Sequence, residues 1–207
     1  MSAAAAFPGR ALDPALRARI EALHEEGRAL FRKFDREVRR EAFHPFMPAD
    51  YGPIIDALLP FRDECRTFLE WGSATGVIAI TADLLGFEAY GIEIDAQLVE
   101  IARDLARRHG SQARFAAGSM LPAGYEWRAA SGDPRLGTIE RGDPGYEQLG
   151  RTLSEFDLIY GYPWSGEDEM MRDLMRRHGA DGGRLLLNGA GGIRVYEVRE
   201  GELRSVS

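Results

Sequence analysis

The chain has 207 residues, of which 44% are hydrophobic, and it carries a formal net charge of −7. This length fits one domain with a sizeable core, and the acidic balance argues against a general nucleic-acid binder, which needs a basic footprint. Cys65 is the only cysteine, so an intrachain disulfide is excluded and we expect no metal site.

The N-terminal segment begins MSAAAAFPGR, without a charged stretch ahead of its alanine run, so we expect no signal peptide. No apolar stretch of the chain reaches membrane-spanning length, and we predict a cytoplasmic protein without a membrane partner. Asp13-Pro14 then predicts a helix N-cap followed by proline at the first helical position. Apolar residues at helical spacing continue this amphipathic helix to about Arg40. Its basic residues from Arg32 onward are interpreted as a solvated face, because acidic partners stand at i,i+4 spacing.

Strands and helices alternate after a second helix at about 49–60. We predict strands at 66–71, 88–94, 113–117, 155–161 and 183–188, with helices at 74–86, 96–109 and 167–178. Ser165 is the expected cap of the last helix, with Asp168 as its capping-box partner. This alternation predicts an α/β fold with a three-layer, mostly parallel sheet.

The chain end and the longest connection depart from this alternation. Residues 192–198, a short turn and ELRSVS predict an antiparallel hairpin, and only GAGG separates it from the fifth strand. Residues 121–154 make a long connection, which we interpret either as a lid or as a disordered insertion. We divide the chain into an arm and long helix at 1–48 and an α/β part at 49–207, within a single domain overall.

The loop after the first strand is the most informative motif. In FLEWGSATG (68–76), Gly72 and Gly76 flank the small residue Ala74. A phosphate-binding loop needs Lys and Ser or Thr after its glycines, and both are absent. A dinucleotide fingerprint needs its third glycine where Val77 stands. About 20 residues further on, in GIEID (91–95), Glu93 ends the second strand, where a carboxylate can accept two hydrogen bonds from a ribose diol.

Together these motifs resemble the class I S-adenosylmethionine-dependent methyltransferases, whose fold is Rossmann-like, over roughly residues 49–198. Ala74 replaces the middle glycine of that family's signature, which is tolerable if φ is negative there. The antiparallel end of the chain agrees with the resemblance, because the family's last strand lies antiparallel beside the fifth. The resemblance implies S-adenosylmethionine as cofactor and these contacts to it: Glu70 near the methionine end, Gly72, Ser73, Ala74 and Gly76 along the loop, Glu93 on the ribose, Ile94, Ser119 and Met120 around the adenine, and Tyr160.

The acceptor is expected over the end of the fourth strand, DLIYGYPWSGEDE (157–169). This stretch resembles the Asn-Pro-Pro-Tyr motif of enzymes that methylate amino nitrogens. Pro163 and Trp164 fit the motif, but Gly161 and Tyr162 replace its Asn and first Pro, so that chemistry is not carried over. Tyr160, Tyr162 and Trp164 are candidates for an aromatic platform that stacks on a substrate. Packing of these rings under neighbouring loops is an equally weighted alternative.

A general base is needed only if the acceptor must lose a proton. Candidates are Tyr160, Tyr162, Glu167 and His44, the last in AFHPFMPADY (42–51), a segment that could fold over the cofactor. We predict methyl transfer to a small-molecule acceptor, with no nucleic-acid partner. A methyltransferase-like binding or scaffold protein without turnover is the second hypothesis, and a nicotinamide-dependent oxidoreductase is a disfavoured third. A homodimer through the N-terminal helix is left open.

Overall fold

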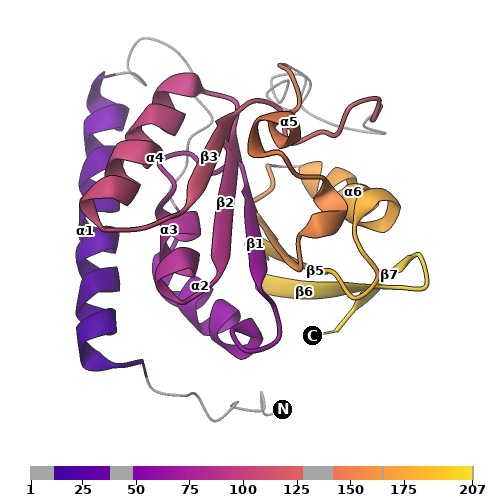
Figure 1. Cartoon of the computed structure of the whole chain (residues 1–207), viewed down its shortest axis with the longest axis horizontal. Coiled ribbons are helices and arrows are strands. Elements are labelled where there is room, and N and C mark those ends of the chain that lie inside the picture. The colour runs from indigo at the N-terminus through magenta and orange to yellow at the C-terminus, as the bar shows by residue number, and fades with distance from the viewer. Residues whose placement is uncertain (1–11, 38–48, 128–141, 165, 207) are drawn as a thin grey trace.

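The computed structural model describes residues 12–37, 49–127, 142–164 and 166–206. Within them, seven strands form one sheet in the order β3-β2-β1-β4-β5-β6-β7 (Figure 1). The first five strands are parallel and the last two are antiparallel to their neighbours. The strands are β1 Thr67–Trp71, β2 Glu88–Glu93, β3 Arg114–Ala117, β4 Leu158–Gly161, β5 Arg184–Gly189, β6 Gly192–Arg199 and β7 Glu202–Ser205. The predicted α/β class is confirmed.

Helices cover both faces of this sheet and create two cores. The helices are α1 Pro14–Glu37, α2 Tyr51–Leu58, α3 Val77–Leu84, α4 Ala96–Arg108, α5 Gly145–Leu149 and α6 Glu167–His178. Side chains of α1 to α4 join one hydrophobic cluster with one face of the sheet, and those of α5 and α6 join a second cluster on the other face. Figure 1 shows these two groups of helices on opposite sides of the strands. The three-layer arrangement is therefore as predicted.

The N-terminal helix starts where the sequence places it. The Asp13 carboxylate accepts the backbone N–H of Leu16 at 3.2 Å, as an N-cap should. Ile20, Leu23 and Gly27 are buried against the rest of the chain. Because this apolar face is used within the chain, a homodimer through α1 would have to use its polar outer face. The predicted end near Arg40 lies outside the described residues.

Two predicted boundaries and one predicted helix cap are wrong. The helix expected from residue 74 begins at Val77, because Ala74 and Gly76 have positive φ. The strand expected from residue 155 begins at Leu158, since Leu153–Glu155 form a 3₁₀ turn with its own capping box. The last helix follows Gly166, its N-cap, without a side-chain cap.

The expected capping box at that last helix stays a prediction. Asp168 pairs with Arg172, one turn along, at 3.3 Å. Ser165, its expected partner, lies outside the described residues.

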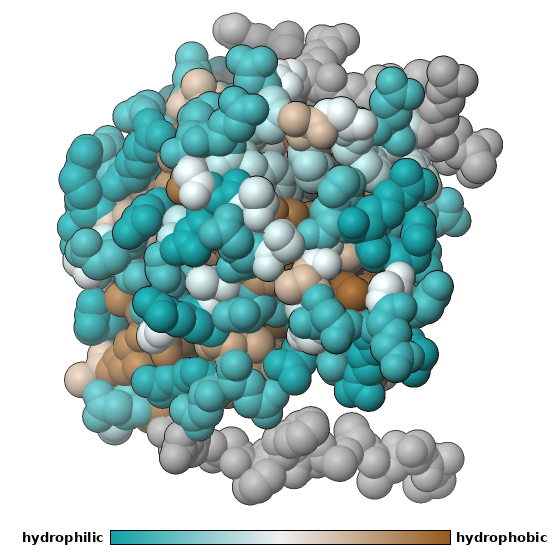
Figure 2. Space-filling view, turned by 45° about the vertical axis from the view of Figure 1, so that its right-hand side comes forward, coloured by the Kyte–Doolittle hydropathy of each residue, from teal (hydrophilic) through white to brown (hydrophobic). Residues whose placement is uncertain are grey.

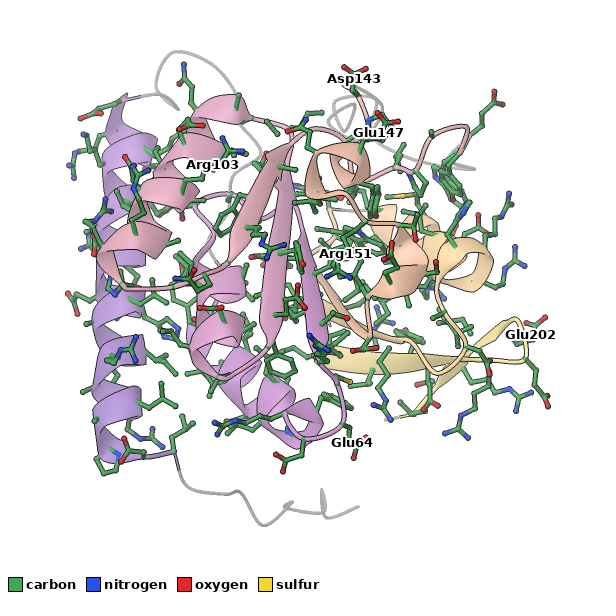
Figure 3. All side chains as sticks on the ribbon, in the orientation of Figure 1. Glu64, Arg103, Asp143, Glu147, Arg151 and Glu202 are labelled. Carbon is green, nitrogen blue, oxygen red and sulfur yellow. The ribbon has the colours of Figure 1, made fainter. Side chains whose placement is uncertain are left out.

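The connection between β3 and β4 contains structure that the sequence did not predict. Residues 142–145 lie beside the end of β3, with the Ser119 N–H donating to the Asp143 carbonyl at 2.8 Å, and α5 follows directly. Figure 3 shows Asp143 and Glu147 around α5, and Arg151 directed at the sheet. The Arg151 guanidinium pairs with Glu88 of β2 at 2.9 Å. Much of this connection is therefore anchored to the sheet, although residues 128–141 lie outside the described part.

The C-terminal strands form a meander. Only Ala190 and Gly191 separate β5 from β6, and so short a link can join only antiparallel neighbours. We expected the last strand beside β5, but β6 takes that place and β7 lies at the edge. The predicted absence of a helix between β5 and β6 is confirmed.

The surface of the described residues is mainly polar. The face in Figure 2 is covered mostly by hydrophilic residues, with smaller apolar areas between them. Tyr162 and Val206 are the large hydrophobic side chains that stand exposed in the described part of the chain. None of the helices described has the length and apolar character needed to cross a membrane.

Candidate functional site

The glycine loop lies at the carboxyl end of β1, between the sheet and α3. The N–H groups of Gly72 and Ser73 both donate to the Ile92 carbonyl of β2, at 2.9 and 3.0 Å. Gly72 has a φ of +67°, and no atom of the described residues lies within 4 Å of a Cβ built on it. The loop is therefore held against β2 while open space remains beside Gly72.

Ala74 adopts a conformation that the sequence argument did not expect. Its φ is +45°, in the left-handed region, so the expectation of a negative φ is wrong. This region costs a residue with a side chain about 1–2 kcal/mol. Two contacts hold Ala74 there: its N–H donates to Glu93 at 2.8 Å, and its methyl group packs near Phe34 and Leu98.

Gly76 has a packing role. A Cβ at this position would lie 2.6 Å from the Phe115 ring and 2.8 Å from the Ala102 Cβ. Glycine is therefore required where α3 begins against β3 and α4. Gly76 does not line the pocket described below.

Glu93 joins the end of β2 to the glycine loop. One carboxylate oxygen accepts the Ala74 N–H, and the other accepts the Asp95 N–H at 3.0 Å. Asp95 in turn caps α4 by accepting the Gln97 N–H at 2.7 Å. Burial raises the pKa of Glu93 above its ordinary value. The carboxylate thus orders the loop while its remaining lone pairs stay available.

Glu70 is a buried carboxylate at the centre of this region. It accepts the backbone N–H of Ala79, in the first turn of α3, at 2.9 Å. Burial raises the pKa of Glu70 well above its usual range, and the nearby Glu93 charge raises it further. A cationic ligand beside Glu70 would favour its ionised form.

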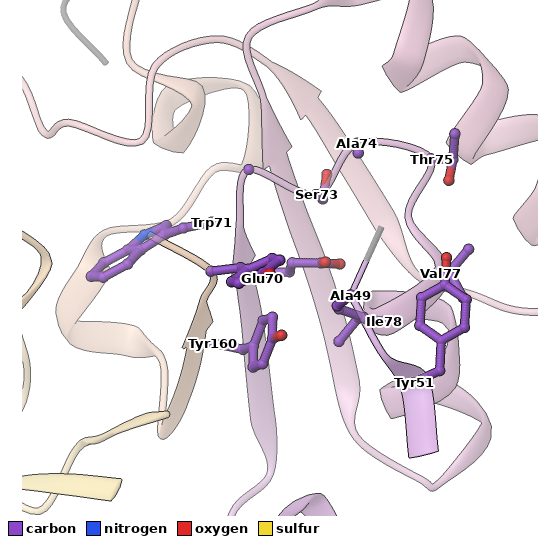
Figure 4. Close-up of a pocket in the computed structure, with 12 residues that line it drawn as sticks. Ala49, Tyr51, Glu70, Trp71, Ser73, Ala74, Thr75, Val77, Ile78 and Tyr160 are labelled. Carbon is purple, nitrogen blue, oxygen red and sulfur yellow. The ribbon is translucent and has the colours of Figure 1, made fainter. Parts of the chain in front are cut away.

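A small pocket, partly open to solvent, lies in front of Glu70 (Figure 4). It brings together six of the predicted site residues: Glu70, Gly72, Ser73, Ala74, Tyr160 and Tyr162. The other lining residues were missed by the sequence argument, and they are Ala49, Tyr51, Trp71, Thr75, Val77 and Ile78. Tyr51 is the last residue of the segment 42–51 that was expected to fold over the cofactor, which was the available signal. His44 of that segment lies outside the described residues.

Several predicted residues do not line this pocket. Ile94, Ser119, Met120, Pro163 and Trp164 are absent from its lining, as are Gly76 and Glu93. The Ser119 hydroxyl accepts the Leu121 N–H at 3.1 Å. The predicted contacts around an adenine therefore stay predictions.

The aromatic residues after β4 have different environments. Tyr160 is 1% exposed and Tyr162 is 43% exposed, and both line the pocket. Burial raises the pKa of Tyr160 far above its ordinary value, so its hydroxyl keeps its proton at neutral pH. A side chain at Gly161 would meet the Met171 sulfur at 2.6 Å, which explains why this position has no Asn.

Glu167 lies at the start of α6, beyond Trp164. It accepts the Trp164 N–H at 2.9 Å through one carboxylate oxygen, while the other is buried and has no hydrogen-bond partner in the described part of the chain. Burial raises the pKa of Glu167 to about 6. Elsewhere, no cluster of His, Cys, Asp and Glu suited to a metal ion occurs among the described residues.

Comparisons with known proteins agree with this architecture. No family model matches the chain. Over 55 residues, 27% of this chain, it is 41% identical to ribosomal protein L11 methyltransferase of Thermus thermophilus, and over 67 residues, 31% of the chain, it is 45% identical to that of Pseudomonas aeruginosa. Each match spans only 22% of the relative's own length.

A similar solved structure is an O-methyltransferase from Bacillus cereus in complex with SAH. The TM-score is 0.51 at 11% identity, over 82% of this chain and 65% of that one. At this identity the likeness concerns the fold alone. The chain therefore has the Rossmann-like fold of the class I S-adenosylmethionine-dependent methyltransferases.

Proposed function

We propose that the chain binds S-adenosylmethionine at the carboxyl ends of β1 and β2 and transfers its methyl group to an acceptor near the end of β4. One observation carries the proposal: a single pocket joins the glycine loop, the buried Glu70 and the aromatic residues that follow β4. In open α/β sheets, ligands bind at this carboxyl edge.

The residues of the pocket fit the charge and shape of this cofactor. A positively charged ligand would favour the ionised form of Glu70, and the described lining residues include no Lys, Arg or His to compete with it. Open space beside Gly72 leaves room for a ligand against the backbone. The Ser73 hydroxyl is buried and has no hydrogen-bond partner among the described residues, as expected of a group that contacts a ligand.

Glu93 is proposed to hold the ribose hydroxyls. Its two backbone hydrogen bonds fix the carboxylate, and each oxygen retains capacity for another donor. A carboxylate already positioned by the protein loses little freedom when it binds a diol.

When bound, S-adenosylmethionine supplies a methyl group on a sulfonium, which an acceptor atom can displace in line. Positioning and exclusion of water can carry much of the rate of such a transfer. We assign positioning to Tyr160 and Tyr162, which line the pocket. Tyr160 is unsuited as a base because its raised pKa keeps it protonated. Glu167 has a more suitable pKa but does not line the pocket.

We propose a small planar molecule as the acceptor, because exposed Tyr162 offers a ring face at the pocket. A macromolecular acceptor is the second candidate, favoured by the ribosomal protein L11 methyltransferases among the relatives. Incubation of the protein with tritiated cofactor and a size-fractionated cell extract separates the two. Label in the low-mass fraction supports the first, and label in protein or RNA supports the second.

Two other hypotheses make different predictions. A scaffold protein would bind the cofactor without transferring label to any fraction. A nicotinamide-dependent enzyme would be expected to continue the sheet with a sixth parallel strand, whereas β6 is antiparallel.

Calorimetric titration with S-adenosylhomocysteine tests the proposed cofactor. We expect micromolar binding, and loss of at least about tenfold in affinity for Glu93→Ala, because a buried anchor of the loop and of the ribose is removed. Glu100→Ala, on the exposed face of α4, is the matched control and should bind like the parent. Absence of binding at millimolar ligand would reject the proposal.

A further inference from the structure

Tyr160 and Asn188 form a polar pair at the ends of two neighbouring strands. Gly161 of β4 pairs with Leu187 of β5, so the residues beside them lie close together. The Asn188 side-chain N–H donates to the Tyr160 hydroxyl oxygen at 3.0 Å. Tyr160 is fully buried and Asn188 is half-buried. Asn188 was not among the residues that the sequence analysis selected.

This hydrogen bond determines where the Tyr160 proton can point. Since the phenol oxygen accepts from Asn188, its own O–H must point in another direction. Among the described residues, no acceptor is recorded for this O–H, and Tyr160 lines the pocket. Figure 4 shows the Tyr160 hydroxyl and the Glu70 carboxylate on the same side, toward Ala49 and Ile78. The pocket thus contains a directed neutral donor next to an acid.

A ligand that ends in an amino acid needs both an acidic partner and a hydrogen-bond donor, because it carries an ammonium group and a carboxylate. Its ammonium group suits Glu70, whereas its carboxylate needs hydrogen-bond donors. The described lining residues include no basic side chain, so uncharged donors must take that part, and the Tyr160 hydroxyl is one of those in the lining. Burial holds Tyr160 in its protonated form, in which it can donate.

We propose that Tyr160 binds the carboxylate at the amino-acid end of S-adenosylmethionine, and that Asn188 is a positioning residue that turns the Tyr160 proton toward it. This assignment rests on the proposed function, because it concerns the same ligand. It defines a carboxylate subsite at the ends of β4 and β5, opposite the ribose contact of Glu93 at the end of β2.

The test compares two ligands that differ in one group. S-Adenosylhomocysteine carries the carboxylate, and S-adenosyl-3-thiopropylamine is the same molecule without it. Tyr160→Phe and Asn188→Leu should each weaken binding of the first about tenfold and leave binding of the second unchanged. The double variant should be no weaker than either single one, because the two residues act as a unit.

Asn188→Asp adds a second line of evidence with almost no change of shape. A carboxylate would accept the Tyr160 proton, so the hydrogen bond would remain but its direction would reverse. We expect it to weaken S-adenosylhomocysteine binding as Tyr160→Phe does, and it carries the test if Asn188→Leu fails to fold. Tyr125→Phe, which loses a hydroxyl bonded to Asp173 and outside the pocket lining, is the control and should bind both ligands like the parent.

The outcomes separate this inference from the proposed function. If the parent binds neither ligand, the proposed function fails and the subsite fails with it. If the parent binds S-adenosylhomocysteine but the Tyr160 and Asn188 variants bind it equally well, only the subsite is rejected. Equal weakening for both ligands also rejects it, because the effect would then not concern the carboxylate.

Discussion

At the scale of single residues, the site depends on two buried carboxylates that water would otherwise solvate. Glu70 and Glu93 are both buried, and burial raises the pKa of each. Backbone N–H groups from α3 and from the glycine loop partly compensate for the lost water. Such groups commonly reduce stability in exchange for ligand binding.

Glu70→Gln should therefore stabilise the free protein and weaken cofactor binding. The glutamine amide oxygen can still accept the Ala79 N–H. The substitution removes a carboxyl group that ionises more easily in the unfolded chain than in the folded one, and this difference favours unfolding at high pH. Because the folded pKa of Glu70 is raised, its stabilising contribution is complete below the unfolded pKa and is lost as pH rises. The gain in unfolding free energy, about 1 kcal/mol at pH 8, should thus shrink at pH 5.

Urea denaturation at both pH values measures this gain, and titration with S-adenosylmethionine measures the loss of affinity. Glu100→Gln on exposed α4 controls for the change of charge. A gain that is larger at pH 5 than at pH 8 would contradict the assigned direction of the pKa.

At the scale of elements, α1 packs closely against the start of α3 at Gly27, which has no side chain. A Cβ on Gly27 would lie 2.5 Å from Val77 Cγ2 and 3.3 Å from the Tyr51 hydroxyl. Val77 and Tyr51 both line the pocket. Close approach of α1 therefore supports two walls of the candidate site.

Gly27→Ala should lower stability although alanine favours helix. The gain in helix propensity is about 1 kcal/mol, whereas overpacking a buried contact typically costs about 1–3 kcal/mol. We expect a net loss of about 1 kcal/mol in the unfolding free energy from urea melts. Combining it with Val77→Ala, which removes the clashing methyl groups, should recover part of that loss. Strict additivity of the two substitutions would show that this contact is not responsible.

At the scale of the whole molecule, buried groups respond to acid in opposite directions. Burial lowers the pKa of His24 to about 4, and the Arg28 charge lowers it further. The His24 ring contacts Tyr51 and bonds Thr81 of α3 at 3.1 Å. Its folded pKa is depressed, so its stabilising contribution is present above the unfolded pKa of about 6.5 and is lost as pH falls toward 4. The pKa values of Glu70 and Glu93 are raised, so the contribution of these two groups to the unfolding free energy becomes more favourable as the pH falls.

His24→Gln should reduce the loss of stability in acid. Glutamine can donate to Thr81 without taking up a proton. Between pH 7.5 and 4.5, the unfolding free energy of the variant should improve relative to the parent by about 2 kcal/mol, after allowance for screening. Chemical denaturation at a series of pH values measures the unfolding free energy of both proteins. If the two free energies change with pH in the same way, His24 is not a neutral buried group.

Much of the fold was predictable because local patterns encode it. Apolar runs of strand length, such as GRLLLN, alternate with amphipathic stretches, and each can bury its apolar side only in a layered sheet. The short GAGG link predicted the antiparallel end of the sheet for a geometric reason. Part of the candidate site could be predicted in the same way, because the glycine loop and Glu93 both stand at the ends of parallel strands.

The failures concern contacts between segments far apart in sequence. The left-handed φ of Ala74 depends on Glu93 and on packing near Phe34, neither of which is local to the loop. The short helix α5 lacked a clear pattern of its own, and it is held by contacts with β2 and β3.

The amino-acid sequence by itself determined the α/β class, the order of most strands and helices, and the carboxyl edge at which the candidate site lies, because periodicity and turn residues act locally. Only the tertiary structure decided which side chains share the pocket. Tyr51 of α2 and Tyr160 of β4 line it together, and Asn188 of β5 donates to the Tyr160 hydroxyl from beside it. Nothing in the spacing of these residues along the chain indicates that they meet. Strand register and helix packing place them, and these depend on the whole core rather than on any one segment.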